Sequence, residues 1–422
     1  MKNGVNKISE QSKKYEKVQS LMHYINKESL IESFRKIDPK KAVGVDRITK
    51  DEYSKHLEKN IDELLGKMKR MGYRPKPTRA RDIPKDNGKM RRLGISCLED
   101  KMVEGIMADV LSAVYEPRFH DFSYGFRPGR SQHDAIADIN HTLMFNRIHY
   151  VIEADITGCF DHIDHEWLKK FLENDIQDPK FIRYIVRFLK SGIMVGNSLE
   201  KTEEGTKQGN RMSPVLANVY LNYVLDDWME SAVQKQMRGF VRMVRFADDF
   251  VIMCQYEEDA IRIFKNLPFR LGKFGLSLNG DKSGISRFDR YDKKNSKSFS
   301  FLGFRFIVGY TRYKKPTVII RTDPKKLSKK KQNIKQWLRE HMHTPIAMVM
   351  DELKAKLRGH YSYYGVNGNF VGVQKYENYV FWTYYKVLRR RGQKNPIKMK
   401  DYSRIWRGLD MPKPCIVHNV WR

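Results

Sequence analysis

Cysteine and long apolar runs are scarce in this 422-residue chain, and their scarcity excludes several classes of protein. The four cysteines, Cys97, Cys159, Cys254 and Cys415, lie far apart and form no C-x-x-C pair, so neither a zinc ribbon nor a disulfide framework is predicted. No apolar run approaches the length of about 20 residues that a membrane-spanning helix needs. The polar, lysine-rich N-terminus lacks the apolar centre of a secretory signal. We therefore expect a cytoplasmic location and no membrane partner.

Acidic residues are too few to balance the basic ones. The chain has 80 Lys and Arg against 50 Asp and Glu, which leaves a formal charge of +30. Such a surplus predicts a polyanionic partner whose binding weakens steeply as the salt concentration rises. Nucleic acid is favoured over an anionic membrane because no long basic amphipathic helix stands out. The length is typical of about three domain-sized units.

Two adjacent carboxylates stand in the middle of the most apolar stretch, residues 241–254, which reads V-R-M-V-R-F-A-D-D-F-V-I-M-C. The flanking runs predict two buried strands, and Asp248 and Asp249 mark the turn between them. Carboxylates beside an apolar sheet are costly unless a cation compensates them, and a divalent metal would do so. An ordinary exposed turn with two acids fits this stretch equally well.

A second acid follows a strand pattern at residues 150–154. That strand leads directly into Asp155, and Gly158 marks a tight turn after it, so Asp155 is a candidate second metal ligand. The neighbouring Asp161, His162, Asp164 and His165 are compatible with a separate metal cluster. Acids at the N-terminus of the following helix explain them better.

The N-terminal third is predicted to be mostly helical. Residues 1–20 are polar and without periodicity, which predicts a flexible basic tail, and residues 21–78 predict a helical extension. From residue 79 the turn signal Asp86-Asn87-Gly88 predicts a basic hairpin with Lys85 on one arm and Arg91 on the other. Such cations could grip a triphosphate from two sides, or the hairpin could simply be solvated.

Two loops have compositions suited to nucleic acid. Residues 123–130, S-Y-G-F-R-P-G-R, interleave arginines and aromatic rings, which suits base stacking, although such loops also cap cores. Residues 205–214, G-T-K-Q-G-N-R-M-S-P, open a helix at about 215–229, with Ser213 as the expected N-cap and Pro214 at the first helical position. Asp226 and Asp227 on that helix are expected to face solvent.

The C-terminal part is strongly basic. Helical patterns at 353–366 and 379–391 alternate Tyr, Trp and Phe with Lys and Arg, which predicts a helical bundle with a surface that binds polyphosphate. An ordinary bundle with a solvated basic face is the alternative. The expected division is therefore 79–312 for the sheet-containing part, 313–395 for the helical bundle and 396–422 for a basic C-terminal segment.

Together these segments resemble the reverse transcriptases encoded by group II introns, the intron maturases. The resemblance covers about residues 28–420, and its motifs occur in the order expected for that family. They are I-P-K-x-x-G-x-x-R at 83–91, Y-G-F-R-P at 124–128, A-D-I-x-G-C-F-D-x-I-D-H at 154–165, Q-G-x-x-x-S-P at 208–214, F-A-D-D at 246–249, F-L-G-F at 301–304 and L-R-G-H-Y-x-Y-Y-G at 357–365.

The resemblance implies an α+β right-hand polymerase, with fingers and palm built from an antiparallel sheet plus helices, and an all-α thumb or maturase domain. It implies that Asp155, Asp248 and Asp249 are catalytic and hold two Mg²⁺ ions, with Mn²⁺ as a possible substitute, and that the carbonyl of Ile156 adds a ligand. The implied dNTP-binding residues are Lys85, Arg91, Phe160 and Gln208. The implied template and primer contacts are Arg127, Lys282, Leu302 and Gly303. The implied RNA-binding residues of the thumb are Arg358, His360, Tyr361, Arg389, Arg390 and Arg391.

The expected activity is RNA-directed DNA synthesis from dNTPs on an RNA template with a DNA primer. The expected partners are structured intron RNA, whose splicing and mobility the protein assists, and target DNA, in the bacterial cytoplasm or nucleoid. No zinc-binding endonuclease pattern follows the thumb, so cleavage of the target strand is not expected. Lys207, Asn210 and Phe246 depart from the family pattern. A non-catalytic splicing factor and a reverse transcriptase recruited to DNA repair or phage defence stay open, and a homodimer is compatible but not deducible.

Overall fold

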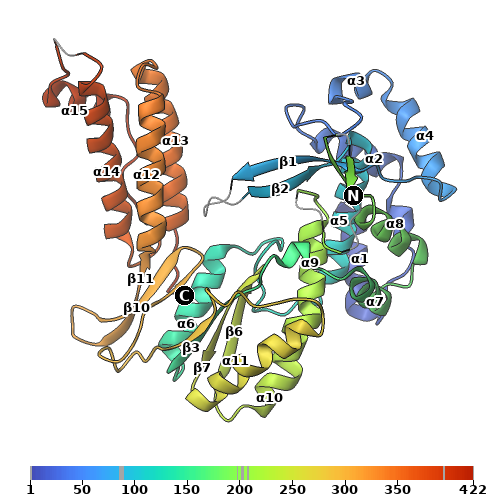
Figure 1. Cartoon of the computed structure of the whole chain (residues 1–422), viewed down its shortest axis with the longest axis horizontal. Coiled ribbons are helices and arrows are strands. Elements are labelled where there is room, and N and C mark those ends of the chain that lie inside the picture. The colour runs from blue at the N-terminus through green and yellow to red at the C-terminus, as the bar shows by residue number, and fades with distance from the viewer. Residues whose placement is uncertain are drawn as a thin grey trace.

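The computed structural model describes residues 2–84, 90–196, 198–200, 204–206, 209–392 and 395–421. Its architecture is mixed α+β, as predicted. Figure 1 shows a central sheet between a helical N-terminal half and a C-terminal helical bundle, with the β1–β2 hairpin reaching toward that bundle. In the described part of the chain, no helix combines the length and apolar character needed to cross a bilayer.

The N-terminal half is built on a long buried helix, α5 (Leu98–Tyr115), whose apolar residues face inward on nearly all sides. Around it lie α1 (Lys2–Lys14), α2 (Lys27–Lys36), α3 (Lys50–Ser54) and α4 (Leu57–Lys69). The capping boxes of α2 and α3 explain why these helices begin where they do, since each satisfies backbone donors at the helix start.

The prediction of a flexible tail over residues 1–20 is wrong. Helix α1 packs against α5 through Ile8, which is fully buried, and Val18 is buried as well. The hydroxyl of Ser9 donates to the carbonyl of Ala113 at 3.0 Å, and that of Ser12 to Val114 at 2.5 Å. These two serines satisfy carbonyls near the C-terminal end of α5, so polar side chains as well as Ile8 hold the segment in place.

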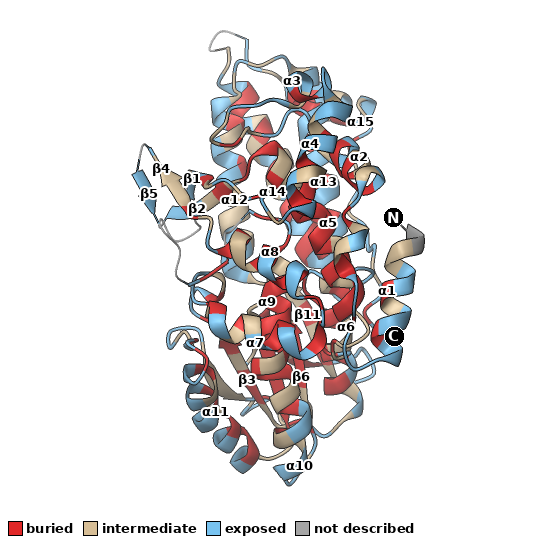
Figure 2. Ribbon diagram, turned by 90° about the vertical axis from the view of Figure 1, so that its right-hand side faces the viewer, coloured by how far each residue is buried: buried red, intermediate tan, exposed pale blue. Residues whose placement is uncertain are grey.

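The central sheet has the strand order β6-β7-β3-β8, and each neighbouring pair is antiparallel. Its strands are β6 (Val241–Phe246), β7 (Asp249–Cys254), β3 (Tyr150–Asp155) and β8 (Gly284–Arg287). Helix α11 (Glu257–Gly272) and helix α6 (Gln132–Phe145) pack on it. Both faces are apolar because alternate residues belong to two different cores, for example Ile152 to one and Val151 to the other. Figure 2 shows the buried interior running through this sheet and its helices.

A second sheet carries the predicted basic hairpin. Its order is β2-β1-β4-β5, with β1 (Thr78–Pro84), β2 (Met90–Ile95), β4 (Ile193–Val195) and β5 (Ser198–Glu200). The turn residues 86–88 lie outside the described residues. Before β4 come α7 (His165–Asp175) and α8 (Pro179–Leu189). Asp164 caps α7 by accepting the Glu166 and Trp167 amides at 2.8 Å each, so its assignment to a helix N-terminus is confirmed.

The helix after the 205–214 loop is α9 (Ser213–Leu221), and it continues through two π-helical segments, Asn222–Asp226 and Met229–Val233, into α10 (Gln234–Gln236). Its cap position is Met212, one residue before the predicted Ser213. The prediction that Asp226 faces solvent is wrong, since its side chain is completely buried. Successive residues of a helix point in different directions, so Asp226 turns inward while Asp227 stays partly exposed beside His120.

A three-stranded sheet of order β11-β10-β9 leads into the C-terminal bundle. The strands are β9 (Phe299–Phe301), β10 (Phe304–Tyr310) and β11 (Pro316–Thr322), and the helices are α12 (Pro324–Glu340), α13 (Ile346–Tyr364), α14 (Phe370–Arg389) and α15 (Met399–Gly408). The predicted boundary at 313 falls between β10 and β11, which pair antiparallel, so it divides a hairpin. The predicted boundary at 395 also fails, because Tyr402 of α15 is buried and donates to the Phe381 carbonyl at 2.9 Å.

The C-terminal segment after α15 returns to the central part of the molecule. The amide nitrogen of Asn140 on α6 donates to the Val420 carbonyl at 3.2 Å. The ring of His133, also on α6, stacks on that of His418 with centroids 3.6 Å apart. Through these contacts the end of the described chain lies against α6, beside the bundle.

Candidate active site

Three carboxylates meet at one end of the central sheet. The register of β3 and β7 places Asp155 directly opposite Asp249. Asp248 precedes Asp249 in a two-residue turn, and its carbonyl accepts the Ile156 amide at 3.4 Å. The turn begins at Ala247, whose φ of 57° is left-handed. The predicted hairpin with acids at its turn, and the acid predicted at the end of the strand at 150–154, thus come together.

The carboxylates repel one another in a partly desolvated place. Burial, together with Asp155 and Asp248, raises the pKa of Asp249 to about 7 from its ordinary value of 3.8. Burial also raises the pKa of Asp248, and the charge of Arg91 on β2 opposes that rise. Arg91 is therefore close enough to act electrostatically on the acids, while Lys85 lies outside the described residues.

Lys282 neutralises part of this charge. Its Nζ lies 2.8 Å from Oδ2 of Asp155, and the amide of Asn279 donates to the same oxygen at 3.1 Å. The hydrogen bond to Asp155 raises the pKa of Lys282. The resemblance implies a primer or template contact for Lys282; in the structure its Nζ lies against Asp155, and a contact with nucleic acid stays a prediction.

The donor set suits a divalent cation. Hard cations such as Mg²⁺ prefer carboxylate and carbonyl oxygens, and the raised pKa values of Asp248 and Asp249 show that their negative charges are only partly compensated. Asp155, Asp248, Asp249 and the backbone carbonyl of Ile156 fit this requirement. Within the described ranges, no group of three His, Cys, Asp or Glu side chains is arranged as a ready-made metal site, and Asp155 is held by Lys282.

Phe160 follows Asp155 by five residues in the sequence. It is partly exposed and meets the ring of Phe126 edge to face at 6.2 Å, while its carbonyl accepts the Thr206 amide at 2.6 Å. Gln208 and Lys207 lie outside the described residues. Asn210 is buried, and its Oδ1 accepts the Met212 amide at 2.7 Å, which gives it a local role in the loop.

The assignment of Arg127 to template or primer is wrong. Its side chain is only 2% exposed and donates to both carboxylate oxygens of Glu116 and to the carbonyls of His120 and Ser123. A guanidinium group has five donors in a plane, so one buried arginine can satisfy a whole loop. The alternative interpretation of this loop, that of a core cap, describes Arg127 correctly.

Leu302 and Gly303 form the tight turn between β9 and β10, both with positive φ. The carbonyl of Leu302 accepts the Tyr363 hydroxyl at 2.9 Å. A side chain at position 303 would meet the Tyr364 hydroxyl at 2.9 Å, so glycine suits this turn. Both residues join the three-stranded sheet to α13, and their contact with a primer stays a prediction.

Two of the six residues assigned to RNA binding are buried. His360 and Tyr361 are each 2% exposed, because the spacing Leu353, Leu357, Tyr361 and Tyr364 places this side of α13 in the core. That assignment is wrong for both. Arg391 donates to the carbonyl of Thr344 and is half-buried. The side chains of Arg358, Arg389 and Arg390 are exposed, and their role in RNA binding stays a prediction.

His360 makes stability depend on pH. Burial, and next the charge of Lys330, lowers its pKa from 6.5 to about 3, and neither ring nitrogen has a hydrogen-bond partner in the described structure. The imidazole of His360 binds a proton more readily in the unfolded chain than in the folded protein. The folded state therefore has its full stability above pH 6.5 and loses stability as the pH falls below that value. Between pH 7.5 and pH 5 the loss should be about 2 kcal/mol. The variant His360→Phe should lack this loss of unfolding free energy between the two pH values, as measured by urea titrations.

The matched control for this effect is the exposed His343. His343→Phe should leave the difference between the two pH values unchanged. An equal pH dependence in the wild type and in His360→Phe would show that His360 is not the group responsible.

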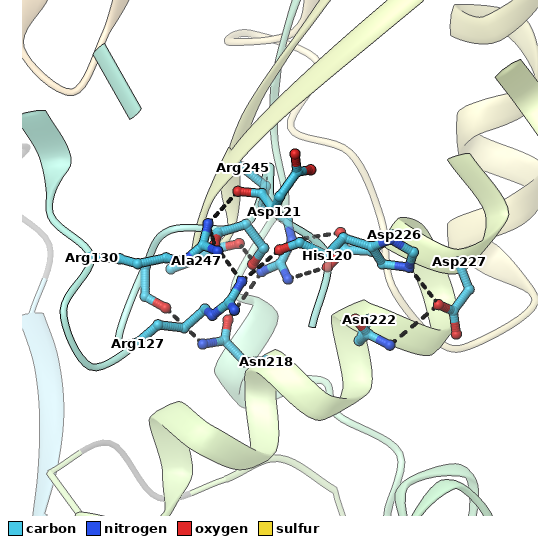
Figure 3. Close-up of polar contacts among 12 residues, drawn as sticks. His120, Asp121, Arg127, Arg130, Asn218, Asn222, Asp226, Asp227, Arg245 and Ala247 are labelled. Atoms are coloured by element: carbon cyan, nitrogen blue, oxygen red, sulfur yellow. Dashed lines mark hydrogen bonds and ion pairs between the residues drawn. The ribbon is translucent and has the colours of Figure 1, made fainter. Parts of the chain in front are cut away.

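None of the sequence patterns pointed to Arg245, a charged residue at a buried position of β6. Its side chain and that of Asp226 form a completely buried ion pair behind the Ala247 turn. The available signal was the position of Arg245 within an otherwise apolar strand, where a charge needs a buried partner. Figure 3 shows the polar contacts that join this pair to the neighbouring loops.

Known protein families and proteins match the part of the chain that contains the candidate site. The signature of the family described as reverse transcriptase (RNA-dependent DNA polymerase) matches residues 83–306, which contain all three acids. The group II intron-encoded protein LtrA of Lactococcus lactis subsp. cremoris is 37% identical over 191 residues, covering 45% of this chain and 32% of LtrA. Protein YkfC of Escherichia coli is 29% identical over 306 residues, covering 65% of this chain and 78% of YkfC.

A plant relative carries a name connected with splicing. Nuclear intron maturase 1 of Arabidopsis thaliana is 30% identical over 106 residues, covering 24% of this chain and 15% of the maturase. The match to LtrA spans about a third of the length of that protein. These relatives confirm the resemblance to group II intron-encoded proteins that the motifs indicated.

Proposed function

Because the chain belongs to the reverse transcriptase (RNA-dependent DNA polymerase) family, we propose that it synthesises DNA on an RNA template by adding dNTPs to a primer 3′-hydroxyl. The observation that carries this proposal is the pairing of Asp155 with Asp249 across β3 and β7, with Asp248 in the adjoining turn. In this proposal the central sheet is the palm, the β1–β2 hairpin belongs to the fingers and the C-terminal bundle is the thumb.

The chain's own residues would divide the work in the following way. Asp155, Asp248, Asp249 and the Ile156 carbonyl would hold Mg²⁺, with Mn²⁺ as a substitute. Bound Mg²⁺ supplies Lewis-acid activation of the 3′-hydroxyl and charge neutralisation at the pyrophosphate. Arg91 on β2 would orient the triphosphate together with Lys85, and Gln208 would help to seat the nucleotide. Lys282 would have to release Asp155 when the site is loaded.

Phe160 would exclude ribonucleotides by filling the space beside the 2′ carbon of the sugar. We expect Phe160→Ala to raise ribonucleotide incorporation relative to dNTP incorporation by about 10- to 200-fold, since pocket contacts of one or two carbons discriminate by about that factor. Single-nucleotide extension with dCTP and CTP measures the ratio of kcat/KM values. Phe126→Ala, which removes the ring that packs edge to face on Phe160, is the control and should change the ratio less. Unchanged discrimination in Phe160→Ala would contradict the assignment.

We further propose that the thumb binds structured intron RNA and so assists splicing and mobility. Two observations support this: the relatives named for group II introns and maturases, and the exposed basic side chains of the bundle. The latter include Lys325, Lys326, Lys335, Arg339, Arg358, Arg389 and Arg390. Phosphate contacts of this kind predict affinity that falls steeply as salt rises.

Primer extension tests the polymerase proposal. The wild-type protein with Mg²⁺, dNTPs and a DNA primer annealed to RNA should extend the primer, and Asp248→Ala should not, while both should bind a group II intron RNA equally in filter assays. No extension by the wild type, together with retained RNA binding, would defeat the polymerase proposal in favour of a non-catalytic splicing factor. Extension without preference for intron RNA over a control RNA would leave the polymerase and remove the maturase role.

A further inference from the structure

The buried arginine behind the catalytic turn has an unusually complete set of partners. Arg245 is 0% exposed, and its Nε donates to Oδ1 of Asp226 at 2.7 Å while one Nη donates to Oδ2 of the same carboxylate. The other Nη donates to Oδ1 of Asn218 and to the carbonyl of Ala247, each at 3.1 Å. Figure 3 shows the guanidinium surrounded by these groups.

Stability alone is a weak explanation for such a pair. Desolvation of two charges is costly, and replacing a buried ion pair by apolar residues of similar volume often leaves stability unchanged or raises it. What distinguishes this pair is the hydrogen bond from Arg245 to the Ala247 carbonyl. Ala247 adopts a left-handed conformation that is unfavourable for a residue with a Cβ, and it directly precedes the two acids Asp248 and Asp249.

The same arginine joins a neighbouring loop to the turn. The side-chain amide of Asn218, which accepts from Arg245, donates to the Gly125 carbonyl at 2.7 Å. The Arg245 amide donates to the Phe122 carbonyl, and the Tyr124 amide donates to the Arg245 carbonyl, each at 2.9 Å. Strand β6 lies at the edge of the central sheet. The loop at residues 122–125 therefore covers the free edge of β6 and contacts the Ala247 turn from outside the sheet.

We propose that Arg245 and Asp226 are positioning residues that hold the Ala247 turn so that Asp248 and Asp249 face Asp155. The guanidinium bond to the Ala247 carbonyl fixes the turn, and Asp226 fixes the guanidinium. Neither side chain touches the reacting atoms, because both are buried behind the turn. The inference deepens the proposed polymerase function and rests on it for the activity readout.

The test separates positioning from stability with a charge-free replacement. Arg245→Met alone leaves Asp226 buried without a partner and should lower the melting temperature. The double variant Arg245→Met/Asp226→Leu should recover most of that melting temperature. We nevertheless expect its dissociation constant for Mn²⁺, measured by electron paramagnetic resonance, to rise at least tenfold, and kcat for primer extension to fall at least 100-fold with little change in KM for dNTP.

Two further variants keep the test decisive. Arg245→Lys retains the charge beside Asp226 but lacks the planar set of donors, so it should fold and still bind Mn²⁺ more weakly. Arg242→Met is the matched control on the same strand, because Arg242 pairs with Asp138 and Asp121 away from the turn. Its Mn²⁺ binding should stay within twofold of the wild type.

The outcomes distinguish the two proposals. Wild-type Mn²⁺ affinity and kcat in the double variant would overturn the positioning role and leave a purely structural pair. If the wild type binds Mn²⁺ but extends no primer, the proposed polymerase function fails. Weaker Mn²⁺ binding in the double variant would then still support the positioning role, and unchanged binding would overturn it too.

Discussion

Replacement of Asp249 by Asn should abolish primer extension while making the protein more stable. The variant loses one of three carboxylates proposed to hold Mg²⁺, so we expect kcat to fall by at least about 10³-fold. It also removes a charge from a site where burial and the neighbouring Asp155 and Asp248 disfavour that charge. Sites built for catalysis commonly carry such a cost in stability.

The gain in stability should depend on pH with a definite sign. The folded-state pKa of Asp249 is about 7 against 3.8 ordinarily, so the folded wild type favours the protonated form. The stability that protonation contributes is present below about pH 4 and is lost as the pH rises through 7. Asparagine resembles the protonated acid. The variant should therefore gain little at pH 4 and about 2 kcal/mol at pH 8, a value reduced because Asp249 is partly exposed.

Urea titrations without added metal, at pH 4, 6 and 8, measure this gain. The control is Asp281→Asn, which removes an exposed acid near the site and should change neither extension nor the pH dependence. Added Mg²⁺ should narrow the difference between the wild type and Asp249→Asn, because the cation stabilises only the intact set of acids. A variant that is less stable than the wild type at pH 8 would show that Asp249 is not electrostatically strained.

Gly125→Ala should damage both folding and catalysis, although the residue bears no chemistry. A Cβ at position 125 would collide with the Ala247 amide nitrogen and lie 3.0 Å from the Phe246 carbonyl carbon. These are backbone atoms of the turn that carries Asp248 and Asp249, so the turn itself has to move. We expect a loss of about 3 kcal/mol in unfolding free energy and about 100-fold in kcat, because misplacement by about 1 Å has effects of that size.

Gly272→Ala is the control for this prediction. Gly272 ends α11 and is exposed, and a methyl group added there would meet no other atom within 4 Å. Alanine at this position should therefore stabilise the protein slightly, by about 0.5 kcal/mol, and leave extension unchanged. Thermal melting and single-nucleotide extension compare the two variants. Wild-type kcat in Gly125→Ala would mean that the loop and the turn are not mechanically coupled.

Much of the candidate site could be predicted from the sequence because it rests on local patterns. The apolar runs on either side of Asp248 and Asp249 predicted the hairpin, and the strand pattern before Asp155 predicted a further acid at the end of a strand. That these acids share one edge of the sheet follows from the antiparallel register of β3 and β7, which the structure supplies. The order of strands and the pairing of β1 with β4 came only from the structure, since they depend on contacts between distant segments.

The errors share one cause, which is that burial of a polar residue depends on a partner remote in sequence. Asp226 resembles a surface acid until Arg245 is found beside it. Arg127 resembles a nucleic-acid contact in the sequence, but in the structure its guanidinium forms an ion pair with Glu116. His360 differs, because the apolar spacing of α13 already placed it on the inner face, and the family motif outweighed that signal.

The contact of Val420 with Asn140 has a consequence for folding during translation. The two residues are 280 positions apart, so α6 emerges from the ribosome well before its partner segment. At about 5–20 residues per second, the delay is about 14–56 s. During that interval the part of the α6 surface around Asn140 and His133 that Val420 and His418 contact in the folded protein has no such cover, so these contacts can form only after the segment around residue 420 has been synthesised.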